Sequence, residues 1–468
     1  MTEEYEIAVL GAGSGGLTAA GFAARIGARV VLIEKDRIGG DCTWNGCVPS
    51  KALLKAAKVA YEIRTAANYG IRAGSPDVDM AQVREYIRGC IRQVAQTETP
   101  EYLQTQGIET VSGTARFLDP HTIAAGDRTI RAKHILITTG AKPAPPNIRG
   151  IETVSYLTYE QVFEVDRLPQ SLIIAGGGPI GVEIAQAWQR LGCQVTIVAR
   201  QLLPREEPSA RQVIQNVLTS EGVRVVTGRV LSVKQDGNEI VAETGETSVR
   251  GESILLASGR RPNVALLDLN RAGITWSEKG IPVDAQLRTN VKHIYAAGDV
   301  LGGHQFTHYA GWQAFQAVRN ALLPGHSAGF PEVLPWVTFT DPEVARVGMT
   351  AEEAQAKFGG HSAVRRWELS HTDRAICDHD TAGFIEVVTG EGGKVLGATI
   401  VAARAGEVIM ELALAMRHDW KLTELASAIH PYPTYATAVQ QMAAEAAVDD
   451  LVTGTAGKLL LKVSGYLR

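Results

Sequence analysis

The stretch Ile7-Ala8-Val9-Leu10-Gly11-Ala12-Gly13-Ser14-Gly15-Gly16 decides the fold of this chain. Its first four residues are apolar and predict a short buried strand. The glycine turn leads into an alanine-rich segment, which we expect to be helical to about residue 26. A second strand is expected at residues 29–33, and Glu34 ends it. Strand, glycine turn, helix, strand and terminal acid together form the unit that binds dinucleotides.

Each glycine of this unit has its own physical reason. Gly11 makes the tight turn, and Gly13 lets backbone amides reach a pyrophosphate at the helix N-terminus. Gly16 lets helix and strand pack closely, and Glu34 can accept hydrogen bonds from a ribose. A lone glycine motif is a weak signal, and a helix cap without a ligand is the alternative. The complete unit favours a nucleotide site.

The same pattern recurs at Ile173-Ile174-Ala175-Gly176-Gly177-Gly178-Pro179-Ile180-Gly181. A helix to about residue 191 and a strand at residues 194–198 should follow. Gly176, Gly178 and Gly181 occupy the positions of the three glycines in the first unit. Two dinucleotide folds in one chain imply two bound dinucleotides.

The two units differ at the end of the second strand. Glu34-Lys35 in the first becomes Ala199-Arg200 in the second. Loss of the acid removes repulsion against a 2′-phosphate, and Arg200, with Arg205 nearby in the sequence, can pair with that phosphate. The first site should therefore take a ribose with free hydroxyls, and the second should prefer NADPH over NADH. The alternative for Arg200 is a solvated surface charge.

Two cysteines stand four residues apart in Gly39-Gly40-Asp41-Cys42-Thr43-Trp44-Asn45-Gly46-Cys47-Val48-Pro49-Ser50-Lys51. Close cysteines outside a secretory context indicate redox or metal chemistry, and a zinc site would need two further ligands nearby. Pro49 fits the first turn of a helix over residues 50–58, so Cys47 should lie near a helix N-terminus that stabilises a thiolate. A reducible disulfide beside a cofactor is one interpretation, and two cysteines lining a loop by chance is the other.

Composition excludes several classes of protein. The 468 residues suggest about three domains. A net charge of −4 without a basic tract argues against nucleic acid as a partner, and no apolar run is long enough for a membrane span. The acidic residues 1–6 do not resemble a signal or transit peptide, so we expect a cytoplasmic protein without a resident metal. Cys90, Cys193 and Cys377 should be buried small hydrophobes.

The rest of the chain connects and follows the two units. Residues 61–110 should be largely helical, and a proline-rich hinge at residues 142–146 should close the first segment. A strand at residues 294–299 ends in glycine and acid, and a helix is expected at about residues 309–322. From residue 336 the pattern predicts a separate α+β domain with helices around residues 407–417 and 434–447.

Several ordered motifs now identify a family. They are residues 11–16, 42–51, 176–183 and 296–299 and the segment His430-Pro431-Tyr432-Pro433-Thr434. Over essentially its whole length the chain resembles the class I pyridine nucleotide-disulfide oxidoreductases, or flavoprotein disulfide reductases. This group includes glutathione reductase, dihydrolipoamide dehydrogenase and mercuric reductase. The resemblance implies an α/β fold with two Rossmann-like domains and a C-terminal α+β dimerisation domain. The implied segments are residues 1–147 and 271–335 for FAD, 148–270 for NADPH and 336–468 for dimerisation.

The resemblance also implies the site. Cys47 would be the sulfur next to the flavin of FAD, and Cys42 would exchange with the substrate. Lys51 would lie beside the flavin, paired with Glu183. Electrons would pass from NADPH through FAD to the cysteine pair and on to a small-molecule acceptor. The implied FAD residues are Gly11, Gly13, Ser14, Gly16, Glu34, Lys35, Gly40, Asp41, Lys51, Thr139, Gly140, Gly298 and Asp299. The implied NADPH residues are Gly176, Gly178, Ile180, Gly181, Glu183, Arg200, Arg205 and Gly259.

The chain departs from the family near its end. Family members form homodimers in which each active site borrows C-terminal residues of the partner, including a histidine before Pro-Thr and a glutamate five residues later. Here these positions hold Tyr432 and Thr437. A tyrosine with its pKa near 10 is a poor base, although it can donate a hydrogen bond. His430 could substitute as an acid, and a packing histidine is the alternative.

The tyrosine favours the mercuric reductase branch, as do residues 195–200 and 339–345. No cysteine follows Cys377, so the C-terminal cysteine pair that hands mercuric ion inward in that branch is missing. We therefore expect an NADPH oxidoreductase whose acceptor is a disulfide, a quinone or a soft metal ion. Alternatives are a dihydrolipoamide dehydrogenase, a disulfide reductase of the glutathione reductase type and a non-catalytic flavoprotein redox sensor.

Overall fold

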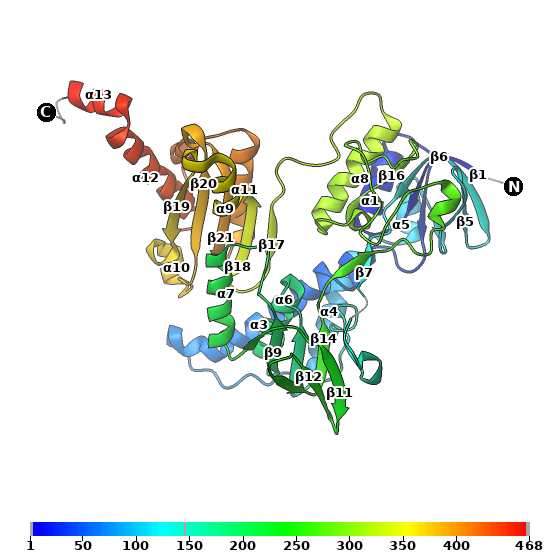
Figure 1. Cartoon of the computed structure of the whole chain (residues 1–468), viewed down its shortest axis with the longest axis horizontal. Coiled ribbons are helices and arrows are strands. Elements are labelled where there is room, and N and C mark those ends of the chain that lie inside the picture. The colour runs from blue at the N-terminus through cyan, green and yellow to red at the C-terminus, as the bar shows by residue number, and fades with distance from the viewer. Residues whose placement is uncertain (1–2, 145–146, 465–468) are drawn as a thin grey trace. The chain divides into compact units, whose positions relative to one another are not determined.

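The computed structural model of the chain describes residues 3–144 and 147–464 (Figure 1). It divides into a first unit, Met1–Arg200 with Val223–Pro331, and a second unit, Gln201–Gly222 with Glu332–Arg468. Of the predicted hinge, Pro145 and Pro146 lie outside the described residues. Among the residues that are described, none of the helices combines the length and apolar character that a membrane crossing requires.

A sheet with strand order β3-β2-β1-β6-β5-β4, and with β16 on β6, forms the core of the first unit. Its parallel strands are β1 (Glu3–Leu10), β2 (Val30–Glu34), β3 (Ile108–Ser112), β6 (Arg128–Ile137) and β16 (Ile294–Ala296). The antiparallel edge is β5 (Thr122–Ala125) and β4 (Arg116–Asp119). β1 is apolar throughout its second half because both faces are buried. Ile7 and Val9 pack towards α1 (Ser14–Arg25) and α8 (Thr307–Leu322), and Ala8 and Leu10 pack on the other side.

The repeat of the glycine motif builds a second, smaller parallel sheet in the same unit. Its order is β10-β9-β8-β14, with strands at Arg224–Thr227, Gln194–Ala199, Ser171–Ala175 and Ser253–Leu256. The helix after its glycine loop is α6 (Pro179–Leu191). An antiparallel sheet of β11 (Ser232–Asp236), β12 (Glu239–Glu243) and β13 (Ser248–Gly251) adjoins it. β7 (Ala141–Pro143) and β15 (Arg260–Pro262) form a short antiparallel pair. Each strand lies in a segment that connects the two parallel sheets.

The cysteine segment folds as two consecutive helices, α2 (Gly40–Trp44) and α3 (Cys47–Thr65). α3 packs against α6 of the second sheet and against α4 (Met80–Ala95), which precedes α5 (Pro100–Thr105). The predicted helix over residues 50–58 is thus part of a longer one that begins at Cys47. This packing brings the cysteine segment beside the second nucleotide-binding helix.

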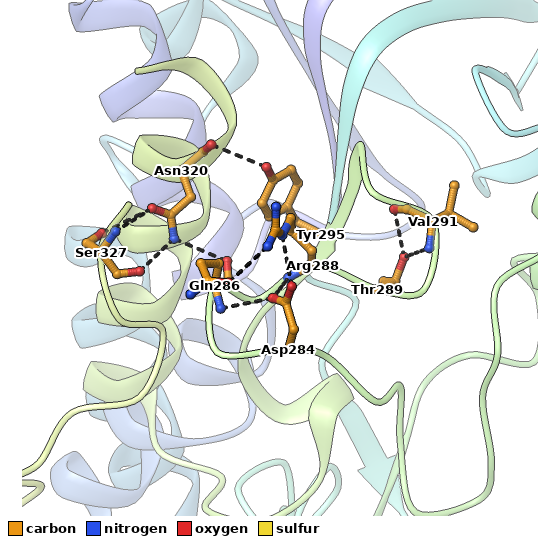
Figure 2. A network of polar contacts seen from close by, with 8 residues as sticks. All are labelled: Asp284, Gln286, Arg288, Thr289, Val291, Tyr295, Asn320 and Ser327. Atoms are coloured by element: carbon orange, nitrogen blue, oxygen red, sulfur yellow. Dashed lines mark hydrogen bonds and ion pairs between the residues drawn. The ribbon is translucent and has the colours of Figure 1, made fainter. Parts of the chain in front are cut away.

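A polar network fixes the chain around β16 and α8 (Figure 2). Arg288 donates to Asp284 at 2.9 Å, and the Asn320 side chain donates to the carbonyls of Gln286 and Ser327 at 3.1 and 2.9 Å. The Tyr295 hydroxyl donates to the carbonyl of Asn320 at 3.3 Å. β16 is only three residues long, so these bonds hold it against α8.

The second unit is an antiparallel sheet with helices. Its order is β17-β18-β21-β20-β19, with strands at Trp336–Thr338, Glu343–Gly348, Val395–Ala402, Phe384–Thr389 and Ala363–Glu368. Its helices are α7 (Pro208–Ser220), α9 (Ala351–Phe358), α10 (Asp373–Cys377), α11 (Ala405–Arg417), α12 (Thr437–Thr453) and α13 (Thr455–Val463). The structure confirms the α+β fold predicted from residue 336.

One helix from the middle of the sequence belongs to this second unit. α7 lies within the predicted segment 148–270, yet residues 201–222 pack with the C-terminal part of the chain. Two buried carboxylates explain this placement. Glu206 accepts from the Trp336 indole at 2.8 Å, and Glu207 accepts from the Ala351 amide at 2.7 Å.

Candidate active site

The first glycine loop is shaped by contacts that exclude side chains. Gly11 has φ +101°, and a Cβ there would lie 2.7 Å from the carbonyl oxygen of Thr138. A Cβ on Gly16 would lie 1.8 Å from the carbonyl oxygen of Gly11. At Gly13, in contrast, the nearest atom would be 3.9 Å away, on Gly40. Protein packing therefore requires the first and third glycines, whereas the middle one leaves a space at the N-terminus of α1.

The second glycine loop repeats this geometry. A Cβ on Gly176 or Gly181 would lie 2.4 or 2.3 Å from a backbone oxygen, whereas a Cβ on Gly178 would meet nothing within 4 Å. Open space in front of a helix N-terminus is the place where a pyrophosphate binds. Both loops thus fit a dinucleotide, and Ile180 is partly exposed at the start of α6.

The ends of the second strands differ as expected. The carboxylate of Glu34 accepts the Ala12 amide at 2.7 Å and the Asp36 amide at 2.9 Å, and it retains lone pairs for a ribose. Ala199 ends β9 as a small buried residue, and Arg200 after it is exposed. Arg205 is exposed too, but it belongs to the second unit. Its role at the phosphate therefore stays a prediction.

Cys42 and Cys47 are free thiols joined by a side-chain hydrogen bond. Cys42 lies on α2, and Cys47 is the first residue of α3. The hydrogen bond from Cys42 is the largest cause that lowers the pKa of Cys47, to about 6; burial opposes it, and Thr307 and Lys51 add to it. The same bond, with burial, raises the pKa of Cys42. At neutral pH the reduced pair therefore carries its negative charge on Cys47.

Two further contacts frame Cys47. The Thr307 hydroxyl, at the start of α8, lies 3.1 Å from the sulfur of Cys47. Lys51, one helical turn after Cys47, donates to the buried Glu183 of α6 at 3.1 Å. The ion pair inferred from the resemblance is thus present in the structure, and it joins the helices of the two nucleotide units.

A second charged group lies beside the cysteine segment. Arg260 donates to Asp299 at 2.7 Å and to Asp41 at 2.6 Å, and the Tyr159 hydroxyl donates to the same Asp41 oxygen at 2.9 Å. Burial raises the pKa of Asp299 in spite of Arg260. Within the described part of the chain, the buried Nε of Arg260 has no hydrogen-bond partner. An unsatisfied donor at this position fits a bound group that carries an acceptor, such as FAD.

The remaining predicted residues of the first unit shape the same surroundings. The Thr139 hydroxyl donates to the Asn263 carbonyl at 2.8 Å, and the Gly140 carbonyl accepts the Asn263 amide at 2.9 Å. The Gly298 amide donates to Gln313, and the Ser14 hydroxyl donates to the Thr307 carbonyl. Gly40 and Gly259 both have positive φ, at +59° and +141°, and Lys35 is exposed.

His430 and Tyr432 lie in the second unit and have partners there. His430 contacts the Ala428 carbonyl through Nδ1 at 3.0 Å and the Glu411 carboxylate through Nε2 at 2.9 Å. These oxygens accept hydrogen bonds, so both contacts favour the protonated form of the ring. Burial acts to lower the pKa of His430, but its bonds to Glu411 and Ala428 raise it overall. This pairing favours the packing role, and an acid role remains a prediction.

Tyr432 is 69% exposed, and its hydroxyl donates to the Asp373 carboxylate. That hydrogen bond raises the pKa of Tyr432, which makes it a still weaker base. Of the three cysteines expected to be buried, only Cys193 is; Cys90 is half-buried and Cys377 is exposed. That expectation was wrong for Cys377 because α10 is a five-residue surface helix, which buries only one of its side chains.

Sequence reasoning missed four residues that contact the predicted site: Thr307, Tyr159, Arg260 and Glu411. Arg260 directly follows the predicted Gly259, so its position at a strand end was a usable signal. The other three carry no local pattern, because each meets its partner only through the tertiary fold. In the described residues, no cluster of three or more His, Cys, Asp and Glu side chains is placed to hold a metal ion.

Comparison with known proteins matches this arrangement. A family model described as pyridine nucleotide-disulphide oxidoreductase matches residues 5–314, and its dimerisation domain matches residues 334–443. Mercuric reductase of Streptomyces lividans is 36% identical over 462 residues, covering 96% of this chain and 97% of that protein. Dihydrolipoyl dehydrogenase of Haloferax volcanii is 35% identical, with coverages of 94% and 96%.

Solved structures agree with the sequence comparison. The flavoprotein disulfide reductase RclA from Escherichia coli, described as induced by HOCl, matches with a TM-score of 0.85 and 27% identity over 94% of this chain and 99% of that one. A Cu(II) complex of the same protein matches with a TM-score of 0.86 over 95% of this chain and 100% of that one, again at 27% identity. The predicted fold class, two nucleotide-binding units with a C-terminal dimerisation domain, is confirmed.

Proposed function

The chain belongs to the pyridine nucleotide-disulphide oxidoreductase family, and from that premise we propose that it oxidises NADPH to reduce a thiophilic metal ion at Cys42 and Cys47. The family uses FAD and a nicotinamide nucleotide, so this chain is a flavin-dependent oxidoreductase of the disulfide reductase type. When bound, FAD supplies the two-electron relay between the nicotinamide and the cysteine pair. The preference for NADPH and the identity of the acceptor are the proposal.

The unequal protonation of the two cysteines carries the proposal. Cys47 is a thiolate at neutral pH and Cys42 a thiol hydrogen-bonded to it. Thiolate sulfur is the ligand that soft metal ions select. The reduced pair therefore offers a preformed anionic sulfur and, beside it, a second sulfur that can lose its proton on metal binding.

The second unit argues against a disulfide as acceptor. Reduction of a disulfide is faster when a proton donor stabilises the leaving thiolate. Tyr432 stands where the family histidine is expected, and its hydroxyl is held by Asp373. Both ring nitrogens of His430 bond to oxygens of its own unit, Nδ1 to the Ala428 carbonyl and Nε2 to the Glu411 carboxylate. A metal ion such as Hg²⁺ needs no such donor, because NADPH and Hg²⁺ give Hg⁰, NADP⁺ and one proton.

The names of related proteins support a metal acceptor. Mercuric reductases are among the relatives, and RclA has been solved as a Cu(II) complex. Residues 378–468 contain no cysteine, so any delivery of metal to Cys42 by these residues would use other ligands. The dimerisation domain supports a homodimer with shared active sites, and the absence of a disulfide at Cys90, Cys193 and Cys377 supports a reducing compartment such as the cytoplasm.

The test is NADPH consumption by the FAD-loaded enzyme against Hg²⁺, Cu²⁺, a quinone, oxidised glutathione and lipoamide. We expect turnover with a metal ion, and at least a hundredfold loss in Cys42→Ser and Cys47→Ser, as for other nucleophile deletions. Cys90→Ser, which changes a half-buried cysteine of α4, is the control and should keep full activity. Faster turnover with a disulfide than with either metal ion would overturn the proposal. So would metal reduction that survives Cys42→Ser.

A further inference from the structure

Cys42 lies on a helix that cannot hold its own position. α2 has five residues, far fewer than the about 12–15 that an isolated helix needs to be stable. It is entered through Gly39 and Gly40, both with positive φ, and no side chain caps its N-terminus. Contacts from outside the helix must therefore set the place of Cys42.

Two such contacts lie after Cys42, where Thr43 donates to Glu98 at 3.1 Å and the Trp44 indole donates to the Ile38 carbonyl at 2.7 Å. A charged group of contacts reaches α2 through the residue before Cys42. The Asp41 oxygen Oδ2 accepts from the Tyr159 hydroxyl at 2.9 Å and from Arg260 at 2.6 Å. Arg260 also donates to Asp299 at 2.7 Å and lies over the Tyr159 ring, 5.2 Å from its centroid. One half-buried cation thus joins two carboxylates. Charge-assisted bonds of this kind are the strongest hydrogen bonds in proteins.

The members of this network come from four separate parts of the first unit. Arg260 opens β15, Asp299 follows β16, Tyr159 lies before β8, and Asp41 belongs to α2. Arg260 and Asp299 lie in or just after a strand, and Tyr159 follows Leu157, which bridges to Leu255 of β14. The network therefore transfers the rigidity of the two sheets to the short helix.

We propose that Tyr159 and Arg260 are positioning residues for the redox pair. By holding the Asp41 carboxylate they fix α2 in place. Cys42 then keeps its hydrogen bond to Cys47, so the negative charge of the reduced pair stays on Cys47. This inference rests on the two cysteines being the redox centre, but it does not depend on which acceptor the enzyme uses.

The experiment follows the charge on Cys47 and needs no acceptor. Holoenzyme reduced with NADPH is treated with iodoacetamide across pH, and alkylation of each cysteine is quantified by mass spectrometry. In the unchanged chain we expect Cys47 to react with a midpoint near its pKa of about 6. Tyr159→Phe should raise that midpoint by about one unit, a tenfold change in the acid dissociation constant. Cys42 should become more reactive at the same time.

Variants at Asp41 give the second arm. Asp41→Ala removes both hydrogen bonds and should shift the Cys47 midpoint at least as far as Tyr159→Phe does. Asp41→Asn keeps an acceptor oxygen and should restore part of the effect. If Asp41→Ala does not fold, Tyr159→Phe and Asp41→Asn decide the question. Unchanged Cys47 midpoints in these variants would overturn the proposal.

The chain offers a matched control in the same unit. Arg128 donates to the Tyr5 hydroxyl at 2.9 Å and to Glu109 at 2.8 Å, which is a second arginine–tyrosine–carboxylate group. Tyr5→Phe should lower thermal stability about as much as Tyr159→Phe, without moving the Cys47 midpoint. An equal shift in both variants would show a merely structural role and overturn the proposal. If the unchanged enzyme does not reduce metal ions but Tyr159→Phe still shifts the Cys47 midpoint, only the proposed acceptor would be refuted.

Discussion

The two glycine loops have nearly the same backbone, and we expect them to bind different nucleotides. Their middle glycines, Gly13 and Gly178, have φ of −77° and −75° and ψ of −169° and 177°. In each loop the third glycine approaches the carbonyl of the first so closely that no side chain fits. The two units also differ at the end of the second strand, where Glu34 ends one strand and Ala199 the other.

This difference separates residues that make the fold from residues that choose the ligand. The first and third glycines are required by atoms of the protein itself, so they repeat without change. Glu34 makes bonds within its own loop, to Ala12 and Asp36, and we expect its remaining lone pairs to accept from a ribose. Arg200 is exposed, and its expected contribution is a positive charge for a 2′-phosphate. Changes at fold residues should therefore abolish binding, and changes at ligand residues should alter preference.

The largest effects are expected at the third glycines. Gly16→Val places a side chain against the Gly11 carbonyl and should yield protein without FAD, measured as loss of flavin absorbance per chain. Gly181→Val should keep FAD but lose reduction of the flavin by NADPH. Gly21→Val is the control, because a Cβ at Gly21 in α1 meets nothing within 4 Å. If both variants keep FAD and are still reduced by NADPH, the third glycines are not required for nucleotide binding.

Much of this first-unit geometry could be predicted from the sequence. The glycines, the terminal Glu34 and the placement of Cys47 at a helix start follow from local patterns, because each depends on near neighbours in the chain. The Lys51–Glu183 pair came from the family resemblance and lies across two helices. Local spacing alone does not place such a pair.

The unpredicted contacts share a physical cause. Thr307 reaches Cys47, and Tyr159 reaches Asp41, only after distant strands have packed. Neither residue stands in a motif, and a threonine or tyrosine has many roles in proteins. The transfer of α7 to the second unit has the same origin, since Glu206 and Glu207 find their partners far along the chain.

The next effect tests the Lys51–Glu183 ion pair, which joins α3 to α6. Lys51 lowers the pKa of Cys47 and Glu183 raises it, so their removal should act in opposite directions. Lys51→Met should move the midpoint of the Cys47 thiolate above about 6, and Glu183→Gln should move it lower. Both should slow flavin reduction by NADPH about tenfold or more, as for loss of a charged active-site contact. The midpoints are read from the thiolate absorbance of the reduced enzyme.

A control for this pair lies one turn further along α3. Lys55 is exposed, so Lys55→Met should leave both the Cys47 midpoint and the rate unchanged. Shifts of the same sign in Lys51→Met and Glu183→Gln would show that α3 has moved, and the electrostatic link between the loops would be rejected.

A smaller effect tests the choice of nucleotide. Arg200→Ala should raise KM for NADPH about 10- to 100-fold, since a hydrogen bond to a charged group contributes about 1.5–3 kcal/mol, and should leave NADH unaffected. Ala199→Glu adds the acid that the first loop carries and should favour NADH further. Arg224→Ala, at the opposite end of the neighbouring strand β10, is the control. Equal losses for NADPH and NADH in Arg200→Ala would make this arginine a general surface charge.

The smallest effect is expected at Glu34, where the loop itself uses part of the carboxylate. Glu34→Gln keeps an acceptor for the Ala12 amide but removes the charge, so the loop should persist while the ribose bond weakens. We expect FAD to dissociate about fivefold more readily, about 1 kcal/mol, with KM for NADPH unchanged. Glu109→Gln on the adjacent strand β3 removes a similar charge and should not alter FAD release. A change in KM for NADPH would mean that the two loops are coupled. Residues of the helices between the loops would then also affect ligand binding.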